Sequence, residues 1–326
     1  MSELYPLVFR PIFKEKIWGG QKIKTILNKD YGALANCGET WELSGVKENI
    51  SIAANGIHKH KSLIELIEEF KGDLVGHSVF QRFGTEFPLL IKFIDANDDL
   101  SIQVHPDDTL AKERHNGFGK TEMWYVVQAD QGASLISGFN QPLDKENYLS
   151  HFNNGSLNEI LNRDDVHKGD VYFIPAGRVH TIGKGLLIAE IQQTSDTTYR
   201  IYDFDRVDAN GNKRELHVDL ALDAIDYSYH QEYKTQYNKP VNTTTDLVQC
   251  DYFTTNVIET SVSLEKNYTS IDSFVIFMCL EGNFSIRTAK DTFDFQLGDV
   301  VLLPATLKNI CIETSSHVKL LETYIA

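Results

Sequence analysis

The amino-acid sequence predicts a fold dominated by β-strands, arranged in two related β-rich units with a few inserted helices. Two observations favour this fold class. Short segments rich in β-branched and aromatic residues recur along most of the 326-residue chain, bounded by Gly, Asp and Asn. One strand-and-turn pattern also occurs twice, as GDVYFIPAGRVHTI over Gly169–Ile182 and as GDVVLLPATLKNI over Gly298–Ile310. We therefore expect an internal duplication of one β-rich unit.

Seven segments are predicted to form the main strands. They are Phe87–Ala96, Glu122–Ala129, Asp170–Ala176, Leu186–Gln193, Ser273–Gly282, Phe293–Ala305 and Val318–Ile325. The order of strand signals after the polar stretch Tyr227–Asp246 repeats the order before it. This repetition indicates that the two units share one topology, and that the polar stretch is a linker or an irregular connection.

Helical signals are fewer. Apolar residues spaced by three and four predict helices over His60–Gly76 and Asp144–Arg163, although Asn-Asn-Gly interrupts the second segment. A third helix is predicted over Glu215–Ile225. These helices are expected as insertions into the β-rich framework.

The bulk composition limits the function classes. No apolar run approaches membrane-spanning length, the first residues lack the pattern of a signal peptide, and the four cysteines form no CxxC pair. We therefore expect a cytoplasmic protein. The net charge of −15 argues against a nucleic-acid or anionic-membrane partner. An anionic small substrate would need a local group of Lys or Arg.

The first copy of the repeat fits the pattern G-x5-P-x-G-x2-H, a signature of the cupin jelly roll. Gly169, Pro175, Gly177 and His180 occupy its fixed positions. The Gly-Asp turn leads into a strand, Pro-x-Gly forms a sharp corner, and the histidine then points into the barrel.

The second copy keeps Gly298 and Pro304 but has Asn309 where the histidine would fall. We expect this copy to fold without binding a metal. The sequence thus predicts a metal-binding catalytic cupin domain with helical insertions over residues 1–226, a linker over 227–245, and a degenerate, metal-free cupin domain over 246–326.

Four side chains form the predicted metal site. Gln103 and His105 are two residues apart, so on a strand they face the same side. Glu122 begins a strand that should lie nearby, and His180 follows the Pro-Gly corner. Each residue alone could be an ordinary loop or surface residue; the set in cupin order indicates a site for one divalent ion. Its N/O ligands suit Zn²⁺ first, and would also accept Fe²⁺, Co²⁺ or Mn²⁺.

Several motifs resemble those of the type I mannose-6-phosphate isomerases in their short bacterial form. They are KIWGG, GETWELS, QVHP, KTEMWYV, GDVYFIPAGRVHTI and TSDTTYRIYDFDR. The resemblance covers essentially the whole chain. It implies two cupin domains of which only the first binds zinc, with Gln103, His105, Glu122 and His180 as ligands. It also implies interconversion of mannose 6-phosphate and fructose 6-phosphate through a cis-enediol, with a small phosphosugar as the substrate.

Three residues are predicted to be catalytic. The resemblance places an essential arginine at Arg200, whose permanent charge would act on the enediolate or the phosphate. Glu190 is a carboxylate amid apolar residues; it is either a base or the partner of Arg200 in a buried ion pair on adjacent strands. Lys120 matches a lysine near the family's substrate, where it would bind phosphate or transfer a proton. The family often has a histidine where this chain has Gly119, so that residue's role does not carry over.

Ser101, Trp18 and Arg206 are weaker candidates for substrate binding. Ser101 shares the face of Gln103, and Trp18 would wall the pocket or simply pack. Arg206 would reach the phosphate or pair with a neighbouring aspartate on the surface.

Two other functions remain open at this stage: an iron-dependent cupin oxygenase, and a non-catalytic sugar-sensing cupin. The sequence does not decide whether Glu190, Lys120 or metal-bound water is the base, nor whether the chain is a monomer or a homodimer.

Overall fold

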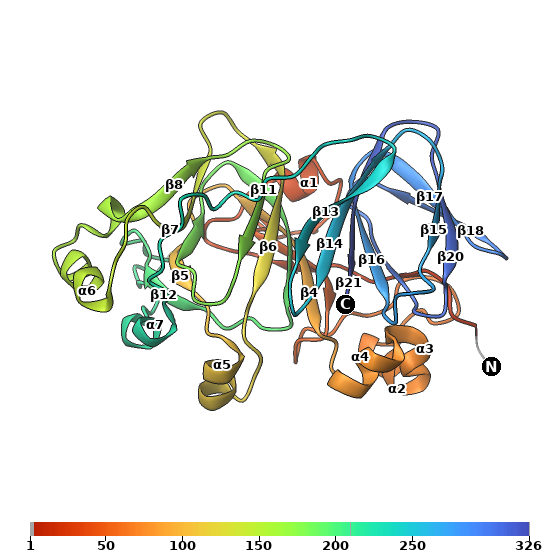
Figure 1. Ribbon diagram of the computed structural model, residues 1–326, viewed down its shortest axis with the longest axis horizontal. Helices are drawn as coiled ribbons and strands as arrows, with labels where there is room; N and C mark the ends of the chain where they lie inside the picture. The colour runs from red at the N-terminus through yellow and green to blue at the C-terminus, as the bar shows by residue number, and fades with distance from the viewer. Residues whose placement is uncertain (1–2, 209, 326) are drawn as a thin grey trace.

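The computed structural model describes residues 3–208 and 210–325, and four β-sheets follow one another along the long axis of the molecule (Figure 1). The outermost sheet of the first half has the order β12 (Tyr199–Tyr202), β5 (Ile102–Val104), β10 (His180–Ile182), β7 (Ser134–Phe139) and β8 (Leu161–Asp165). It faces a sheet with the order β2 (Ile12–Lys14), β3 (Glu39–Ser44), β4 (Leu89–Ala96), β11 (Leu186–Gln193), β6 (Glu122–Ala129) and β9 (Val171–Ile174).

The second half of the chain builds the other two sheets. One has the order β1 (Leu7–Val8), β19 (Val300–Leu303), β16 (Val275–Glu281), β21 (Val318–Tyr324), β14 (Thr254–Thr260) and β13 (Thr243–Gln249). The last has the order β15 (Leu264–Asn267), β20 (Asn309–Glu313), β17 (Asn283–Arg287) and β18 (Thr292–Gln296). The predicted fold class is confirmed. The predicted strand Phe293–Ala305 is in fact two strands, because the turn at Gly298 separates β18 from β19.

The strand pairing repeats between the halves, as the duplicated motif predicts. In the first half β11 pairs with β4 and β6, and β6 pairs with β9. In the second half β21 pairs with β14 and β16, and β16 pairs with β19. β1 comes from the N-terminal segment but pairs with β19, so the start of the chain joins the sheet of the second half.

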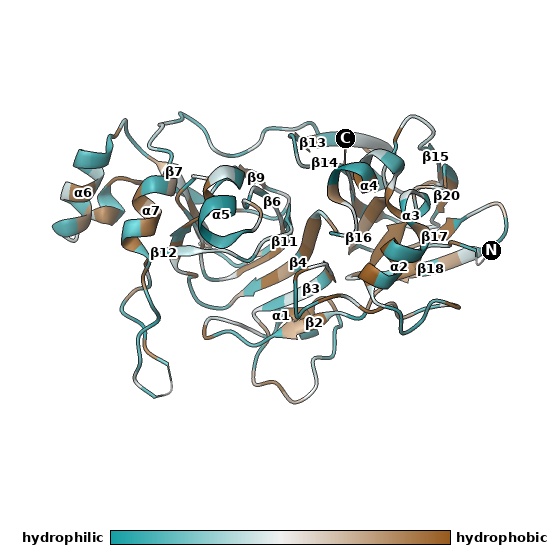
Figure 2. Cartoon of the chain, turned by 90° about the horizontal axis from the view of Figure 1, so that it is seen from below, coloured by the Kyte–Doolittle hydropathy of each residue, from teal (hydrophilic) through white to brown (hydrophobic). Residues whose placement is uncertain are grey.

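Apolar side chains fill the spaces between the sheets. Trp124 and Ile182 belong to the core between the first two sheets, and Phe277 belongs to the corresponding core of the second half. The central core contains Ile91 and Leu321 and joins the two six-stranded sheets (Figure 2). Because these sheets are covered on both faces, β4 and β11 are buried at every residue and read as near-continuous apolar runs.

The helices differ from the sequence prediction in their ends. The segment His60–Gly76 forms two helices, α2 (Leu63–Phe70) and α3 (Gly72–Val75), because Lys71 between them has φ of 48°. α7 (Val218–Ala224) lies within the third predicted helix.

The prediction of a helix up to Arg163 is wrong. Only α6 (Lys145–Asn153) and a single 3₁₀ turn, η1 (Leu157–Glu159), are helical, and the chain then enters β8. Three helices of the described chain were not predicted: α1 (Lys22–Thr25), α4 (His77–Phe83) and α5 (Asp108–His115). α5 buries only Ala111, so it has no apolar periodicity to reveal it.

The residue that replaces the cupin histidine in the second half also needs correction. Counting from Pro304 gives Asn309, but this side chain is exposed. Ile310 is the inward residue: it is 2% exposed, belongs to the core of the second half, and pairs with Lys266 as His180 pairs with Gln103. Counting from the proline misses the equivalent position by one residue, because His180 comes five residues after Pro175 whereas Ile310 comes six residues after Pro304.

Over residues 3–208 and 210–325, the structure has no helix long and apolar enough to span a membrane.

The two halves are in close contact at the start of α4 (His77–Phe83). The carboxylate of Asp272 accepts hydrogen bonds from the backbone N–H groups of His77 and Ser78, both at 2.8 Å. Gly76 precedes this helix with φ of 99°, and a Cβ there would lie 2.2 Å from the carbonyl oxygen of Asp272. Only glycine fits this position without displacing the second half.

Replacement of Gly76 therefore tests the packing of the two halves. Gly76→Ala is expected to lower the free energy of unfolding by about 3 kcal/mol or more, from backbone strain plus overlap with Asp272. Gly84→Ala is the matched control, because Gly84 has φ of 60° with no atom within 4 Å of the added Cβ. Its ψ of −124° lies outside the left-handed helical region, and strain alone predicts a loss of about 1–3 kcal/mol there. Equal losses in the two variants, measured by thermal or denaturant unfolding, would contradict a tight contact.

Candidate active site and metal centre

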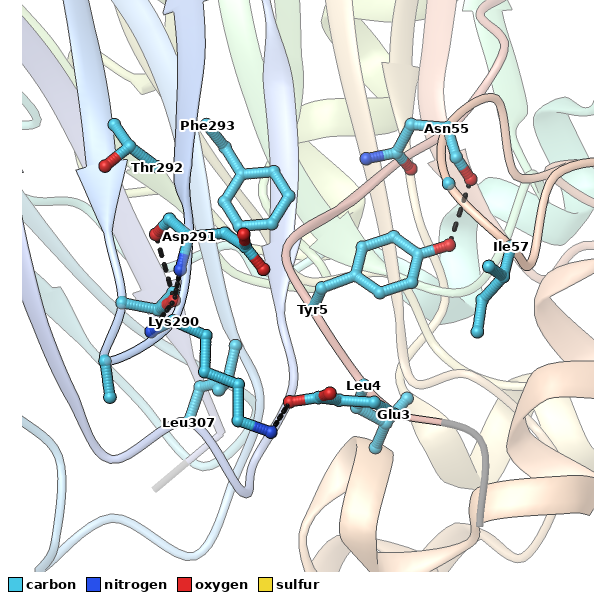
Figure 3. A pocket seen from close by; sticks show the side chains of 13 residues that line it. Glu3, Leu4, Tyr5, Asn55, Ile57, Lys290, Asp291, Thr292, Phe293 and Leu307 are labelled. Carbon is cyan, nitrogen blue, oxygen red and sulfur yellow. Dashed lines mark hydrogen bonds and ion pairs between the residues drawn. The ribbon is translucent and has the colours of Figure 1, made fainter.

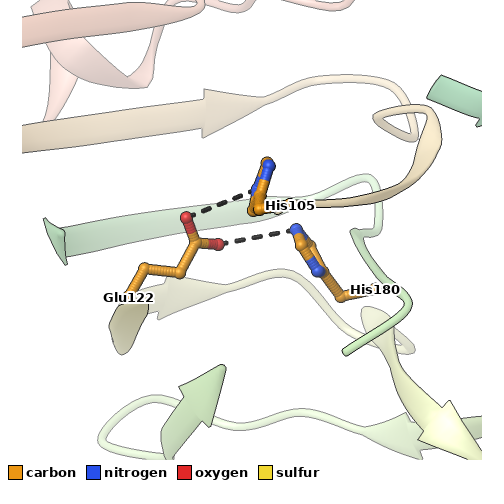
Figure 4. Close-up of side chains that lie close together, drawn as sticks. All are labelled: His105, Glu122 and His180. Atoms are coloured by element: carbon orange, nitrogen blue, oxygen red, sulfur yellow. Dashed lines mark ion pairs between the residues drawn. The ribbon is translucent and has the colours of Figure 1, made fainter. Parts of the chain in front are cut away.

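Two histidines and one carboxylate converge between the two sheets of the first half (Figure 4). The ligand atoms of His105, Glu122 and His180 all lie within 4.8 Å of one another. Nε2 of His105 is 3.6 Å from Oε2 of Glu122, and Nε2 of His180 is 3.5 Å from Oε1. All three side chains are buried. The structure thus brings together three of the four residues predicted as ligands in an arrangement that could hold a metal.

Strand pairing and a tight corner create this convergence. Glu122 is the first residue of β6, and His180 is the first residue of β10. His105 follows β5, the neighbour of β10. The N–H of Gly177, in the corner before His180, donates to the carbonyl oxygen of His105 at 2.9 Å. Gly177 has φ of 89°, a backbone conformation that favours glycine, so the cupin motif supplies the residue that this corner requires.

The orientation of both imidazoles suits metal binding. Nδ1 of His105 lies 2.9 Å from the carbonyl oxygen of Thr197, and Nδ1 of His180 lies 2.8 Å from that of Arg178. A carbonyl only accepts, so each Nδ1 carries the proton and each Nε2 carries the lone pair, on the side of the ring near Glu122. Nε2 of His105 accepts from Nζ of Lys120 at 3.0 Å. Burial lowers the pKa of His105 well below its usual value and lowers that of His180 to about 3. Both rings are therefore neutral at pH 7, the form that binds metals.

The carboxylate between the two rings is under-compensated. Both oxygens of Glu122 are buried; within the described chain Oε1 accepts no hydrogen bond, and Oε2 has only the ammonium of Lys120, with Nζ at 2.9 Å. Burial and the nearby charge of Glu190 raise the pKa of Glu122 to about 7. The charges of Lys120 and Lys92 oppose this shift but do not cancel it. A buried carboxylate beside two neutral imidazoles is a donor set that fits a divalent cation.

Gln103, the fourth predicted ligand, lies at the edge of this cluster. Its Nε2 is 3.3 Å from Nε2 of His180, and its Oε1 accepts a hydrogen bond from the hydroxyl of Ser101. Rotation of the amide by 180° exchanges the two atoms, which would turn the oxygen towards the histidines. The side chain is therefore within reach of the site.

Glu190 is held by partners other than the one predicted. Its Oε1 lies 3.1 Å from Nζ of Lys92, and its Oε2 accepts a hydrogen bond from Nε1 of Trp124 at 2.9 Å. The alternative of a Glu190–Arg200 ion pair on adjacent strands is wrong, because β11 and β12 belong to different sheets. Burial alone would raise the pKa of Glu190, but the charges of Lys92 and Lys120 outweigh burial and lower it. Glu190 is therefore ionised at neutral pH.

A cavity of about 300 Å³ opens above these residues. Gln103, Lys120, Glu190 and Arg200 line it, and so do Trp18 and Ser101, two of the weaker candidates. Arg206 is not among its lining residues; its guanidinium instead donates to Asp203 at 2.6 Å. The structure thus gathers all predicted catalytic residues around one space and leaves Arg206 beside it.

The charge of the cavity lining is opposite to that of the whole chain. Five cationic side chains line it: Lys16, Lys92, Lys120, Arg200 and Arg214. Three acidic side chains line it: Glu39, Glu190 and Asp196. A chain with a net charge of −15 therefore has a cavity with an excess of positive groups, as an anionic substrate requires.

Some of these residues were missed by the sequence analysis. Lys92 is a lysine within an apolar strand, and this is the same signal that identified Glu190. Lys16 and Glu39 pair at 3.1 Å across the cavity wall, but their sequence neighbourhoods are polar and give no comparable signal. Arg214 comes from the irregular segment between β12 and α7.

A larger cavity of about 610 Å³ lies between the N-terminal segment and the second half (Figure 3). Tyr5 and Phe293 face one another there with ring centroids 6.2 Å apart. It shares no lining residue with the cavity above the histidines. Its size alone does not make it the functional site, since Lys120, which contacts His105 and Glu122, lines the smaller cavity.

Comparison with known proteins places this geometry in a family. The family model for the catalytic domain of type I phosphomannose isomerase matches residues 7–129, and that for the cupin domain of mannose-6-phosphate isomerase matches residues 243–324. A protein named mannose-6-phosphate isomerase ManA from Bacillus subtilis (strain 168) is 37% identical over 314 residues, which cover 94% of this chain and 96% of that protein. The mannose-6-phosphate isomerase of Streptococcus mutans is 35% identical over 315 residues, which cover 93% of this chain and 94% of that protein.

A solved structure agrees with these matches. The crystal structure of the mannose 6-phosphate isomerase from Bacillus subtilis superposes with a TM-score of 0.87 at 34% identity, covering 98% of this chain and 99% of that chain. Fold, motifs and full-length similarity lead to one conclusion: the chain belongs to the type I phosphomannose isomerase family.

Proposed function

We propose that this protein is a zinc-dependent aldose–ketose isomerase that interconverts mannose 6-phosphate and fructose 6-phosphate through a cis-enediol intermediate. The observation that carries the proposal is the convergence of two neutral imidazoles and one buried carboxylate. Gln103 and Lys120 contact this cluster and line a cavity with excess positive charge. Relatives that match over nearly their whole length are named mannose-6-phosphate isomerases. The cytoplasmic location remains a prediction, as does the choice between monomer and homodimer.

In this proposal His105, Glu122, His180 and Gln103 hold the metal. When bound, a divalent cation supplies a Lewis acid that offsets negative charge developing on the sugar oxygens. The carbonyl groups of Thr197 and Arg178 support the site by fixing the tautomers of the two histidines. The burial of Glu122, with no donor to its Oε1 within the described chain, supports a cation as its partner.

Glu190 is the proposed general base. Isomerisation requires a proton to leave C2 and a proton to reach C1, and one carboxylate can perform both transfers. Glu190 lines the cavity and is ionised, and Trp124 and Lys92 fix its orientation. Lys120 lies 3.0 Å from Nε2 of His105 and 2.9 Å from Glu122, so its charge is proposed to act on substrate oxygens beside the metal.

Arg200 is proposed to act electrostatically on the anionic substrate, and Ser101 and Trp18 to contact it in the cavity. Guanidinium keeps its charge at all physiological pH values, so Arg200 supplies a fixed positive charge and no proton transfer. Its Nη1 donates to the carbonyl oxygen of Glu215 at 2.7 Å, which holds the side chain at the cavity wall.

The chemistry is proposed to be confined to residues 1–226, with 227–245 as a linker and 246–326 as a metal-free cupin domain. The equivalent positions in the second half support this division. Val275 starts β16 opposite Leu303 as Glu122 starts β6 opposite Ile174, and Ile310 takes the place of His180. Neither replacement can bind a metal.

Removal of either histidine tests the metal site. His105→Ala and His180→Ala are each expected to lose the bound ion and at least about 10³-fold in turnover of mannose 6-phosphate, because each removes a ligand. His230→Ala, at an exposed position, is the control and should retain both. Elemental analysis and a coupled isomerase assay measure the two effects. A double variant with full metal occupancy would refute the assignment, whereas oxygen consumption by an iron-loaded protein would favour an oxygenase.

Substitution of Arg200 tests its electrostatic role. Arg200→Lys keeps the charge but loses the planar, forked donor geometry, and is expected to lower kcat/KM by about 10²–10³ with metal and fold intact. Arg200→Ala should lose at least as much. Turnover, metal content and thermal midpoint are measured on the same preparations. Near-normal kcat/KM in a folded, metal-loaded Arg200→Ala protein would rule out the role.

The base assignment is tested at Glu190. Glu190→Gln is expected to lower kcat by about 10²–10⁴ while retaining the metal. It also leaves Lys92 without its carboxylate, so the thermal midpoint should fall. Adding Lys92→Met should restore the thermal midpoint but not the turnover. Turnover that recovers together with stability would show that Glu190 is only structural. If the unmodified protein has no isomerase activity, the result would favour a sugar-sensing protein.

A further inference from the structure

The positive charge of the cavity is not evenly compensated. Each of its three lysines has a carboxylate partner: Lys16 pairs with Glu39, Lys92 with Glu190, and Lys120 with Glu122, at 2.9–3.1 Å. Arg200, one of the two arginines of the lining, differs. Within the described chain Arg200 forms no ion pair, and its Nε is buried without a hydrogen-bond partner. The arginine end of the cavity is therefore where an anion is lacking.

Arg214 lies at this end because backbone contacts join its segment to β12. The N–H of His217 donates to the carbonyl oxygen of Arg200 at 2.7 Å, and Nη1 of Arg200 donates to the carbonyl oxygen of Glu215. These bonds fix Glu215 and His217 beside Arg200, so Arg214 enters the same cavity wall. Burial lowers the pKa of Arg200 most, and the nearby charge of Arg214 lowers it further. Arg200 nevertheless remains charged.

Asp203 orients Arg214. Nε of Arg214 donates to Oδ2 of Asp203 at 2.7 Å, and its Nη2 donates to Oδ1. Asp203 is 5% exposed and also accepts from Arg206, which in turn reaches Asp98 at 3.5 Å. One buried carboxylate is thus shared by two arginines, and in the described chain no protein acceptor binds Nη1 of Arg214. Asp196, the remaining acid of the lining, is exposed and forms no ion pair there.

We infer that Arg214, oriented by Asp203, binds the phosphate group of the substrate together with Arg200. The inference rests on the proposed function for the identity of the substrate, but the anion-binding chemistry stands on the geometry. A dianionic phosphate offers several acceptor oxygens, and it would satisfy both Nη1 of Arg214 and the buried Nε of Arg200. Arg214 is then a substrate-binding residue that selects phosphorylated over free sugars, and Asp203 is a positioning residue.

Substitution of Arg214 separates this role from catalysis. Arg214→Gln is expected to raise KM for mannose 6-phosphate by about 10–100-fold, the range for loss of hydrogen bonds to a charged group, with kcat within about threefold of wild type. The inhibition constant of inorganic phosphate should rise by the same factor. Arg287→Gln is the matched control, because Arg287 also pairs with carboxylates, those of Glu265 and Glu313, but lies on β17 in the second half. It should change neither constant.

Asp203→Asn tests the positioning role. The variant keeps an acceptor for Arg214 but loses the charge that holds it. KM and the inhibition constant of inorganic phosphate should therefore rise by less than in Arg214→Gln, with kcat retained. A residue that only stabilises the fold would instead lower the thermal midpoint and the amount of active enzyme without moving KM. An unchanged KM in Asp203→Asn would refute the positioning role.

Direct binding of inorganic phosphate, measured by calorimetry on the metal-loaded protein, tests the phosphate site separately from the isomerase function. If wild type isomerises mannose 6-phosphate but Arg214→Gln retains both KM and phosphate affinity, the inference is wrong and the proposed function stands. If wild type has no isomerase activity but binds phosphate in an Arg214-dependent manner, the proposed function is wrong and the anion site stands. Phosphate binding that no variant weakens would overturn the assignment of this site.

Discussion

The architecture of the first half depends on the burial of one carboxylate, Glu122, opposite two neutral imidazoles. Such a group is costly to remove from water unless a cation or several donors compensate it. Lys120 provides partial compensation at 2.9 Å, yet the pKa of Glu122 remains raised to about 7. The strand register places β5, β6 and β10 around Glu122. The resulting arrangement of side chains is more favourable with a bound cation than without one.

The second half shows the same scaffold without that requirement. Glu322 pairs with Asn256 across β14 as Glu190 pairs with Lys92 across β4, so the duplication has kept a carboxylate on the equivalent strand. Here Lys266 lies 2.8 Å from Glu322 and enters from the strand position that corresponds to Gln103. An internal ion pair thus takes the place of the metal-binding set, and Val275 fills the position of Glu122. The two halves solve the burial of polar groups in different ways on one fold.

The parts of the structure that follow from local pattern could be predicted from the sequence. β4, β6, β11 and β21 lie in segments rich in β-branched and aromatic residues, and the cupin corner fixes the position of His180. The partners of Glu190 and the role of Arg214 could not be predicted, because they depend on which strands share a sheet and on an irregular segment pinned by backbone hydrogen bonds. The helix ends were missed for a similar reason: tertiary contacts, such as that of Asp272 with α4, decide them.

The central claim, a single divalent ion held in the first half, is tested most directly by anomalous X-ray diffraction at the zinc absorption edge from crystals of the active protein. We expect one anomalous peak per chain, within bonding distance of His105, Glu122 and His180 and with Gln103 turned towards it. We also expect no peak in the barrel that contains Val275 and Ile310. A fully active crystal preparation with no peak at the three residues, or with its peak in the second half, would contradict a metal site in the first half.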